Sequence, residues 1–90
     1  MSKIPIKNRT VKDVLNEYIN KYQPKDVDLC ELFGVSRQAL WNYKKGHHLP
    51  GVKRLYEIAV AHTGEWEGAM ALDMLATMGV TILVQQAVPA

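Results

Sequence analysis

The sequence predicts a mostly α-helical single domain of five helices, followed by a short C-terminal β-strand. Three observations lead to this fold class. Apolar residues recur at spacings of three and four along most of the chain, which is the period of an amphipathic helix. Proline, glycine and capping residues divide that pattern into five segments. The 90 residues are 48% hydrophobic, which is enough for one core, and the single Cys allows no disulfide framework.

The chain begins with a basic segment that lacks helical periodicity. Residues 1–9 contain a proline and three Lys or Arg residues, and we expect a flexible basic arm there. Thr10 and Asp13 have the spacing of a capping box, and the apolar pattern predicts a first helix over residues 11–22. The pair Gln23-Pro24 is expected to end it, because the residue before a proline is pushed out of the α region.

Two short helices are expected next, with a tight turn between them. Asp26 is the predicted N-cap of the second helix, and Gly34 is expected to end it. Ser36 is the predicted N-cap of the third helix, which Gly46 ends. Two short helices around a glycine turn are the minimal pattern of a helix-turn-helix, and taken alone that pattern is a weak indicator.

The second half of the chain predicts two further helices. Pro50 or Gly51 opens the fourth helix, and Thr63-Gly64 breaks it. Residues 65–78 predict the fifth helix, with acidic residues in its first turn where the helix dipole favours them. The predicted domain therefore covers residues 10–79.

The C-terminal residues 80–90 have a different composition. The run 80–84 is β-branched and predicts a strand, and no Lys or Arg follows Arg54. An apolar strand edge favours pairing, so we expect this tail to join two copies of the chain into a twofold homodimer. The predicted interface residues are Met74, Met78, Val80, Ile82 and Val84. The alternative is a strand that folds back onto its own domain.

The segment from Leu29 to Pro50 carries a more specific signal. Its sequence, LCELFGVSRQALWNYKKGHHLP, closely resembles the helix-turn-helix of the Cro and cI-type repressor family. The matching features are a small residue at Cys30, the turn Gly34-Val35-Ser36, apolar Leu40 and Tyr43, a closing Gly46 and an opening Pro50. The resemblance covers about residues 10–62. It implies a five-helix, lambda-repressor-like helix-turn-helix domain, and a Cro-like bacteriophage or prophage regulator that represses transcription by occupying a palindromic operator.

The third helix is the predicted reading helix. With Leu40 and Tyr43 directed inward, the helical period turns a polar face with one tryptophan outward. Arginine pairs with guanine edges in the major groove, and glutamine or asparagine pairs with adenine edges. The predicted base-reading residues are Arg37, Gln38 and Asn42, which match the reading positions of the family, with Trp41 and Ala39 as secondary candidates.

Basic residues surround that helix. The net charge is only +2, but all 11 Lys and Arg residues lie at or before Arg54. The resemblance places backbone-phosphate contacts at the end of the reading helix and in the following loop, and phosphate contacts supply affinity rather than sequence information. The predicted phosphate contacts are Lys25, Ser36, Lys44, Lys45, His47, His48, Lys53 and Arg54.

Other interpretations stay open. The polar face and the basic cluster can be ordinary solvated surface. The chain can be a protein-interaction module, such as a phage factor that binds a host protein, with Trp41 and Trp66 as anchors. An antitoxin or restriction-control regulator would have much the same sequence.

Several function classes have little support. No nucleophile, phosphate loop or carboxylate pair has catalytic spacing, so we expect no enzyme activity. Adjacent His47 and His48 point in divergent directions and lack further ligands, so no metal is expected, and neither is a cofactor or a small-molecule ligand. No apolar run approaches the length of a membrane span, and a single Cys fits a reducing cytosol. The resemblance to phage repressors implies that this is the cytoplasm of a bacterial host cell.

Overall fold

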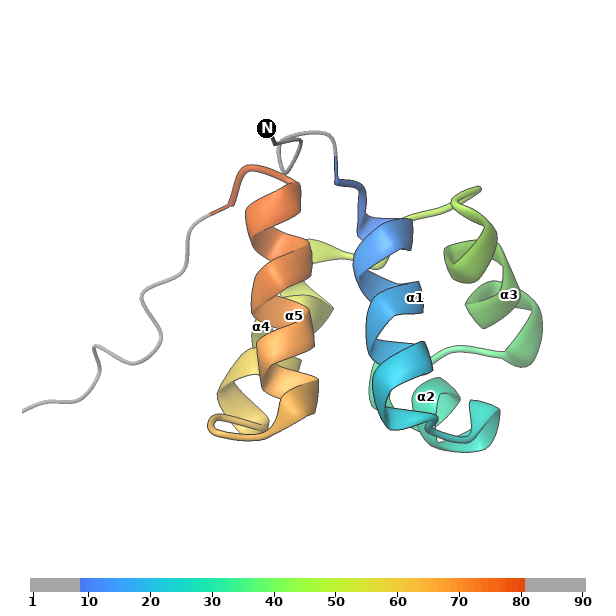
Figure 1. The fold of residues 1–90 in the computed structure, drawn as a ribbon, viewed down its shortest axis with the longest axis horizontal. Helices are drawn as coiled ribbons and strands as arrows, with labels where there is room; N and C mark the ends of the chain where they lie inside the picture. The colour runs from blue at the N-terminus through green and yellow to red at the C-terminus, as the bar shows by residue number, and fades with distance from the viewer. Residues whose placement is uncertain (1–8, 81–90) are drawn as a thin grey trace, which may run out of the picture.

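The computed structural model describes residues 9–80, and these residues fold into five α-helices without a strand (Figure 1). The helices are α1 (Val11–Tyr22), α2 (Asp26–Phe33), α3 (Arg37–Lys45), α4 (Val52–Ala61) and α5 (Trp66–Thr77). The prediction of five helices in this order is confirmed. In Figure 1, α1 lies between the α4–α5 pair and the α2–α3 pair.

The start of α1 follows from its capping residues. The Thr10 hydroxyl accepts a hydrogen bond from the Asp13 N–H at 3.2 Å, and the Asp13 carboxylate accepts one from the Thr10 N–H at 3.0 Å. The predicted capping box is therefore present. Of the predicted basic arm, residues 1–8 lie outside the described residues, and Arg9 forms an ion pair with Glu17.

The end of α1 lies where the sequence predicted it, at Tyr22. Gln23 leaves the right-handed α region before Pro24 and adopts the left-handed conformation, with φ 53°. In that conformation its N–H donates to the Ile19 carbonyl at 2.7 Å. The helix end is thus set by a left-handed cap as well as by the proline.

The cap of α2 is a correction to the sequence analysis. Lys25 occupies the N-cap position, without a side-chain capping bond, and Asp26 is the first helical residue. The Asp26 carboxylate instead accepts a hydrogen bond from Lys44 on α3. The Asp26 side chain, which was predicted to cap α2, therefore bonds to a residue of another helix instead.

The turn between α2 and α3 has the predicted chemistry. Gly34 adopts φ 70°, a left-handed value that disfavours any residue with a Cβ, and its N–H donates to the Glu31 carbonyl at 3.2 Å. The Ser36 hydroxyl accepts from the Ala39 N–H at 3.2 Å and so caps α3. These bonds fix where α3 begins relative to the end of α2.

The core is formed by apolar side chains from all five helices. It consists of Val11, Val14, Leu15, Leu29, Phe33, Leu40, Leu55, Ile58, Ala59, Met70, Ala71, Met74 and Leu75. Near the surface, the Tyr18 hydroxyl donates to the Asp73 carboxylate at 2.7 Å and links α1 to α5. Burial and this bond raise the pKa of Tyr18 to about 12.

The C-terminal end corrects part of the predicted dimer surface. Met74 is fully buried in the core of its own chain, at 0% exposure, so it presents no side chain to a partner. Met78 and Val80 pack at the edge of the core, and the Val80 N–H donates to the Leu75 carbonyl at 2.8 Å. Val80 therefore closes α5 and does not begin a strand, while Ile82, Val84 and the rest of the predicted strand lie outside the described residues.

None of the helices within residues 9–80 combines the length and the apolar character that a membrane crossing needs.

Candidate nucleic-acid interface

One face of α3 is packed and the opposite face is open. Leu40 is 1% exposed, and the Tyr43 ring meets the Phe33 ring edge-on at 5.6 Å. These two contacts hold α3 against the domain and direct its other side outward. There, the Arg37 side chain is 82% exposed and Trp41 is 48% exposed.

The five predicted base-reading residues are not equally accessible. Arg37, Gln38 and Trp41 are exposed, whereas Ala39 and Asn42 are half-buried. The Asn42 carbonyl accepts a hydrogen bond from the His47 N–H at 2.9 Å, which closes the C-terminal end of α3. The three exposed side chains therefore define the accessible face of α3.

A basic hollow continues this face toward α1. It has a volume of about 460 Å³ and is lined by Lys12, Asn16, Trp41, Lys44 and Lys45. Lys12 and Asn16 come from α1 and were missed by the sequence analysis. Their spacing of four residues places them on one side of α1. That spacing indicates a shared surface with α3 only when it is known that α1 packs beside α3. We refer to these five residues as the basic hollow.

Asn16 fixes the position of α1 against the end of α3. Its side-chain amide donates to the Lys44 carbonyl at 3.1 Å and to the Lys12 carbonyl at 2.9 Å. The last carbonyls of a helix have no partner within the helix. Asn16 therefore satisfies one of these groups on α3 and holds the wall of the basic hollow in place.

An acidic residue lies beside the exposed basic face. The Lys44 ammonium donates to the Asp26 carboxylate at 2.7 Å, and a guanidinium nitrogen of Arg37 lies 4.0 Å from the same carboxylate. The hydrogen bond from Lys44 is the main reason that the pKa of Asp26 is held below its ordinary value. Lys44 is thus partly neutralised within the chain, while Arg37 stays largely solvated.

Trp41 is surrounded by cationic and aromatic groups. The Lys45 ammonium lies 5.8 Å from the centre of the Trp41 ring, in a cation–π arrangement. The His47 ring is 5.7 Å from the same ring. The exposed indole of Trp41 therefore has an ammonium group and an imidazole ring as near neighbours.

The remaining predicted phosphate contacts lie around α3. Lys25, His47, His48, Lys53 and Arg54 are exposed. The Arg54 guanidinium covers the turn at Gly34, where an added Cβ would lie 2.8 Å from it, and it pairs with Glu57 at 3.5 Å. The Ser36 hydroxyl accepts a capping bond, which leaves its own hydrogen available to an external acceptor.

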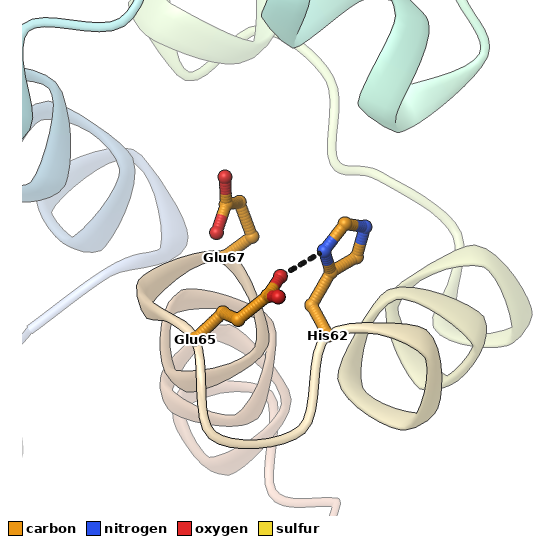
Figure 2. Close-up of side chains that lie close together, drawn as sticks. All are labelled: His62, Glu65 and Glu67. Atoms are coloured by element: carbon orange, nitrogen blue, oxygen red, sulfur yellow. Dashed lines mark hydrogen bonds and ion pairs between the residues drawn. The ribbon is translucent and has the colours of Figure 1, made fainter.

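A second polar group lies at the turn between α4 and α5. Figure 2 shows His62, Glu65 and Glu67 gathered there, with a 2.7 Å hydrogen bond between His62 Nδ1 and the Glu65 carboxylate. Their ligand atoms all lie within 4.8 Å of one another. Only His47 and His48 were weighed as metal ligands from the sequence, so this group was missed, although the spacing His-x-x-Glu-x-Glu was a signal.

Comparisons with protein-family models, with curated proteins and with solved structures found no match to this chain. What the exposed face of α3 binds is therefore inferred from its own chemistry.

Proposed function

We propose that this chain is a sequence-specific transcriptional regulator that binds double-stranded DNA. In this proposal α2 and α3 act as a helix-turn-helix within a lambda-repressor-like domain, and α3 enters the major groove. The observation that carries the proposal is the open face of α3, where Arg37, Gln38 and Trp41 are exposed beside a hollow lined by three lysines.

The side chains on that face suit the edges of base pairs. The exposed guanidinium of Arg37 matches the O6 and N7 acceptors of guanine, and the Gln38 amide matches the N6 and N7 groups of adenine. Trp41 offers apolar contact to a thymine methyl group or a sugar. Asn42 is half-buried, so we assign it a smaller part than Arg37 and Gln38.

The lysines supply the contacts to the DNA backbone. Lys12 and Lys45 flank the hollow next to α3, and neither forms an ion pair within residues 9–80. Each phosphate contact of this kind releases condensed counterions, which gives affinity that depends strongly on salt. Lys25, Lys53 and the loop histidines extend the same proposed contact area.

Two copies are needed for high affinity at a palindromic site. A twofold dimer that places its two α3 helices about 34 Å apart would reach successive major grooves on one face of the duplex. Such a dimer represses by covering a promoter. This mode of action and an origin in a bacteriophage, within the cytoplasm of a bacterial host, are part of the proposal. An antitoxin or restriction-control regulator would use the same surface.

The proposal is tested by selecting bound fragments from random duplex DNA with the full chain. We expect a recovered motif with twofold symmetry, bound more tightly than random duplex. In the same assay, the variant Arg37→Ala should lose preference at one base pair of each half-site, at a cost of about 1–3 kcal/mol. Recovery of unselected sequences only, or equal losses on selected and random duplex, would contradict the proposal.

A protein-interaction module is the second candidate, and the exposure of Trp41 at 48% is the observation that favours it. The two functions differ in which side chains they need. Base reading requires Arg37 and Gln38, whereas an aromatic anchor requires Trp41 alone. Trp66 is a weaker anchor than expected, because it is half-buried and stacks on Tyr22 with ring centres 4.8 Å apart.

A further inference from the structure

The turn between α4 and α5 brings one imidazole and two carboxylates together (Figure 2). His62 is the C-cap of α4, Glu65 is the N-cap of α5, and Glu67 lies in the first turn of α5. The Glu65 side chain makes no capping bond to its own helix, so helix capping does not account for its position. The His62 Nδ1 atom lies 2.7 Å from the Glu65 carboxylate, and one imidazole nitrogen and one oxygen of each carboxylate all lie within 4.8 Å of one another.

The turn itself is tightly packed. Gly68 is buried against it, and a Cβ at that position would lie 2.3 Å from the His62 carbonyl oxygen. The Glu65 N–H donates to the same carbonyl at 2.9 Å. The backbone at His62 is therefore held by a hydrogen bond from Glu65 and by close packing against Gly68.

Charge at this corner is unbalanced. Within residues 9–80, neither Glu65 nor Glu67 pairs with a lysine or arginine, and the chain has no lysine or arginine after Arg54. A neighbouring hollow of about 290 Å³ is lined by His62 and Glu67, and its other wall, from α2, adds Asp28 and Glu31. The lining of this hollow contains no lysine or arginine. Three carboxylates and the imidazole therefore line this hollow, and Glu65 adds a fourth carboxylate beside His62.

We propose that His62, Glu65 and Glu67 form a binding site for a divalent transition-metal ion of the Zn²⁺ type. An imidazole nitrogen with two carboxylate oxygens suits Zn²⁺, whereas Ca²⁺ and Mg²⁺ prefer sites made of oxygen ligands only. Three protein ligands leave a fourth tetrahedral position for water.

Ligation requires only a small rearrangement. Ligands at about 2.0–2.2 Å from a tetrahedral Zn²⁺ lie roughly 3.3–3.6 Å from one another. His62 Nδ1 and the Glu65 oxygen must therefore separate slightly from their hydrogen-bonded distance of 2.7 Å, and no pair of the three ligand atoms needs to close from more than 4.8 Å. The His62 Nδ1 atom exchanges its bond to Glu65 for a bond to the metal, and so it must be unprotonated. The bound ion would fasten the end of α4 to the start of α5.

The experiment is a calorimetric titration of the full, untagged chain with ZnCl₂, together with thermal unfolding with and without the ion. We expect one ion per chain at this site and a higher Tm when it is bound, because a ligand that binds only the folded state stabilises it. The variants His62→Ala and Glu67→Gln should each weaken binding at least about tenfold. As a control, far-ultraviolet circular dichroism is used to check that each variant is folded.

The double variant His47→Ala/His48→Ala is the matched control, because it removes two exposed histidines from another part of the surface. Its affinity for Zn²⁺ should stay within about twofold of that of the wild type, since it lacks none of the proposed ligands. Three results would overturn the proposal. They are absence of saturable Zn²⁺ binding, unchanged affinity in either ligand variant, or loss of binding in the double variant alone. None of these outcomes depends on DNA binding.

Discussion

The Lys44 ammonium donates a 2.7 Å hydrogen bond to the Asp26 carboxylate, which ties the end of α3 to the first turn of α2. The pair is half-exposed, with the Lys44 side chain 27% and the Asp26 side chain 43% exposed. The Asp26 carboxylate therefore lies at the edge of the proposed DNA-binding face and forms an ion pair with Lys44, one of the cations of that face. It stabilises the arrangement of the two helices and, in the proposed function, repels phosphate.

The variant Asp26→Asn tests this double role on DNA. Loss of the carboxylate frees Lys44 for a phosphate, so binding to every duplex should tighten, and the log–log salt dependence should steepen by roughly 0.9. Fluorescence anisotropy at several salt concentrations measures both effects. The control is Asp28→Asn, which removes the same charge from α2 at the hollow near His62. An equal gain in both variants would mean that net charge alone is responsible.

The stability difference between the wild type and Asp26→Asn should depend on pH. The hydrogen bond from Lys44 holds the pKa of Asp26 below its ordinary value of 3.8. A carboxyl with a lowered folded-state pKa contributes stability above its unfolded pKa and loses that contribution as the pH falls through the folded pKa. Wild type should therefore be more stable than Asp26→Asn at neutral pH, and the difference should disappear in the acid range below 3.8. Urea unfolding measures it, and a difference that is independent of pH would contradict the assignment.

Lysines of the basic hollow should contact phosphate. Lys45→Ala and Lys12→Ala should each weaken binding to selected and random duplex alike, and each should lower the salt slope by roughly 0.9. Lys21→Ala is the matched control, because Lys21 lies on α1 like Lys12 but over the Tyr22 ring, 5.3 Å from its centre. If Lys45→Ala and Lys12→Ala leave the slope at the value of the control, the hollow is only solvated surface.

The amide of Asn16 should be needed for stability. Asn16→Ala removes the bond to the Lys44 carbonyl and should lower the free energy of unfolding by about 0.5–1.5 kcal/mol. Asn20→Ala changes an exposed residue on the same helix and should have little effect. Equal unfolding midpoints in urea for the two variants would show that the bond to α3 contributes nothing.

Deletion of residues 81–90 tests the proposed dimer. The deletion keeps Val80, because its N–H closes α5 by donating to the Leu75 carbonyl. If the tail joins two chains, the truncated protein is a folded monomer in sedimentation and binds a full palindrome more weakly than the intact protein. A truncated chain that remains dimeric contradicts this role. If the tail instead folds back on its own domain, the intact protein is already a monomer in sedimentation. The deletion would then lower the free energy of unfolding and leave the protein monomeric.

Local signals predicted most of the helix boundaries. The capping box of Thr10 and Asp13, the cap at Ser36 and the glycine at position 34 act through bonds to residues a few positions away, so the sequence contains them in full. Asp26 was misjudged because its partner, Lys44, is 18 residues distant. A local capping rule has no information about such a partner.

The periodicity of apolar residues does not say what covers them. Met74 lies on an apolar stripe of α5 and was predicted to meet a second chain, but its own core buries it completely. The basic hollow was missed for a related reason, since Lys12 joins the predicted face only because α1 packs against α3. Arg37, Gln38 and Trp41 were predicted to point outward because Leu40 and Tyr43 anchor the opposite side of a single helix.

The role of α3 as the proposed DNA-binding surface is tested most directly by amide chemical shifts measured during titration with duplex DNA. We expect the largest changes at Arg37 to Lys45 and at Lys12 and Asn16, with little change at the α4–α5 turn. The changes should saturate and should weaken as salt is added. Absence of saturable changes in α3, or changes centred on Trp66 and the α4–α5 turn, would contradict the account.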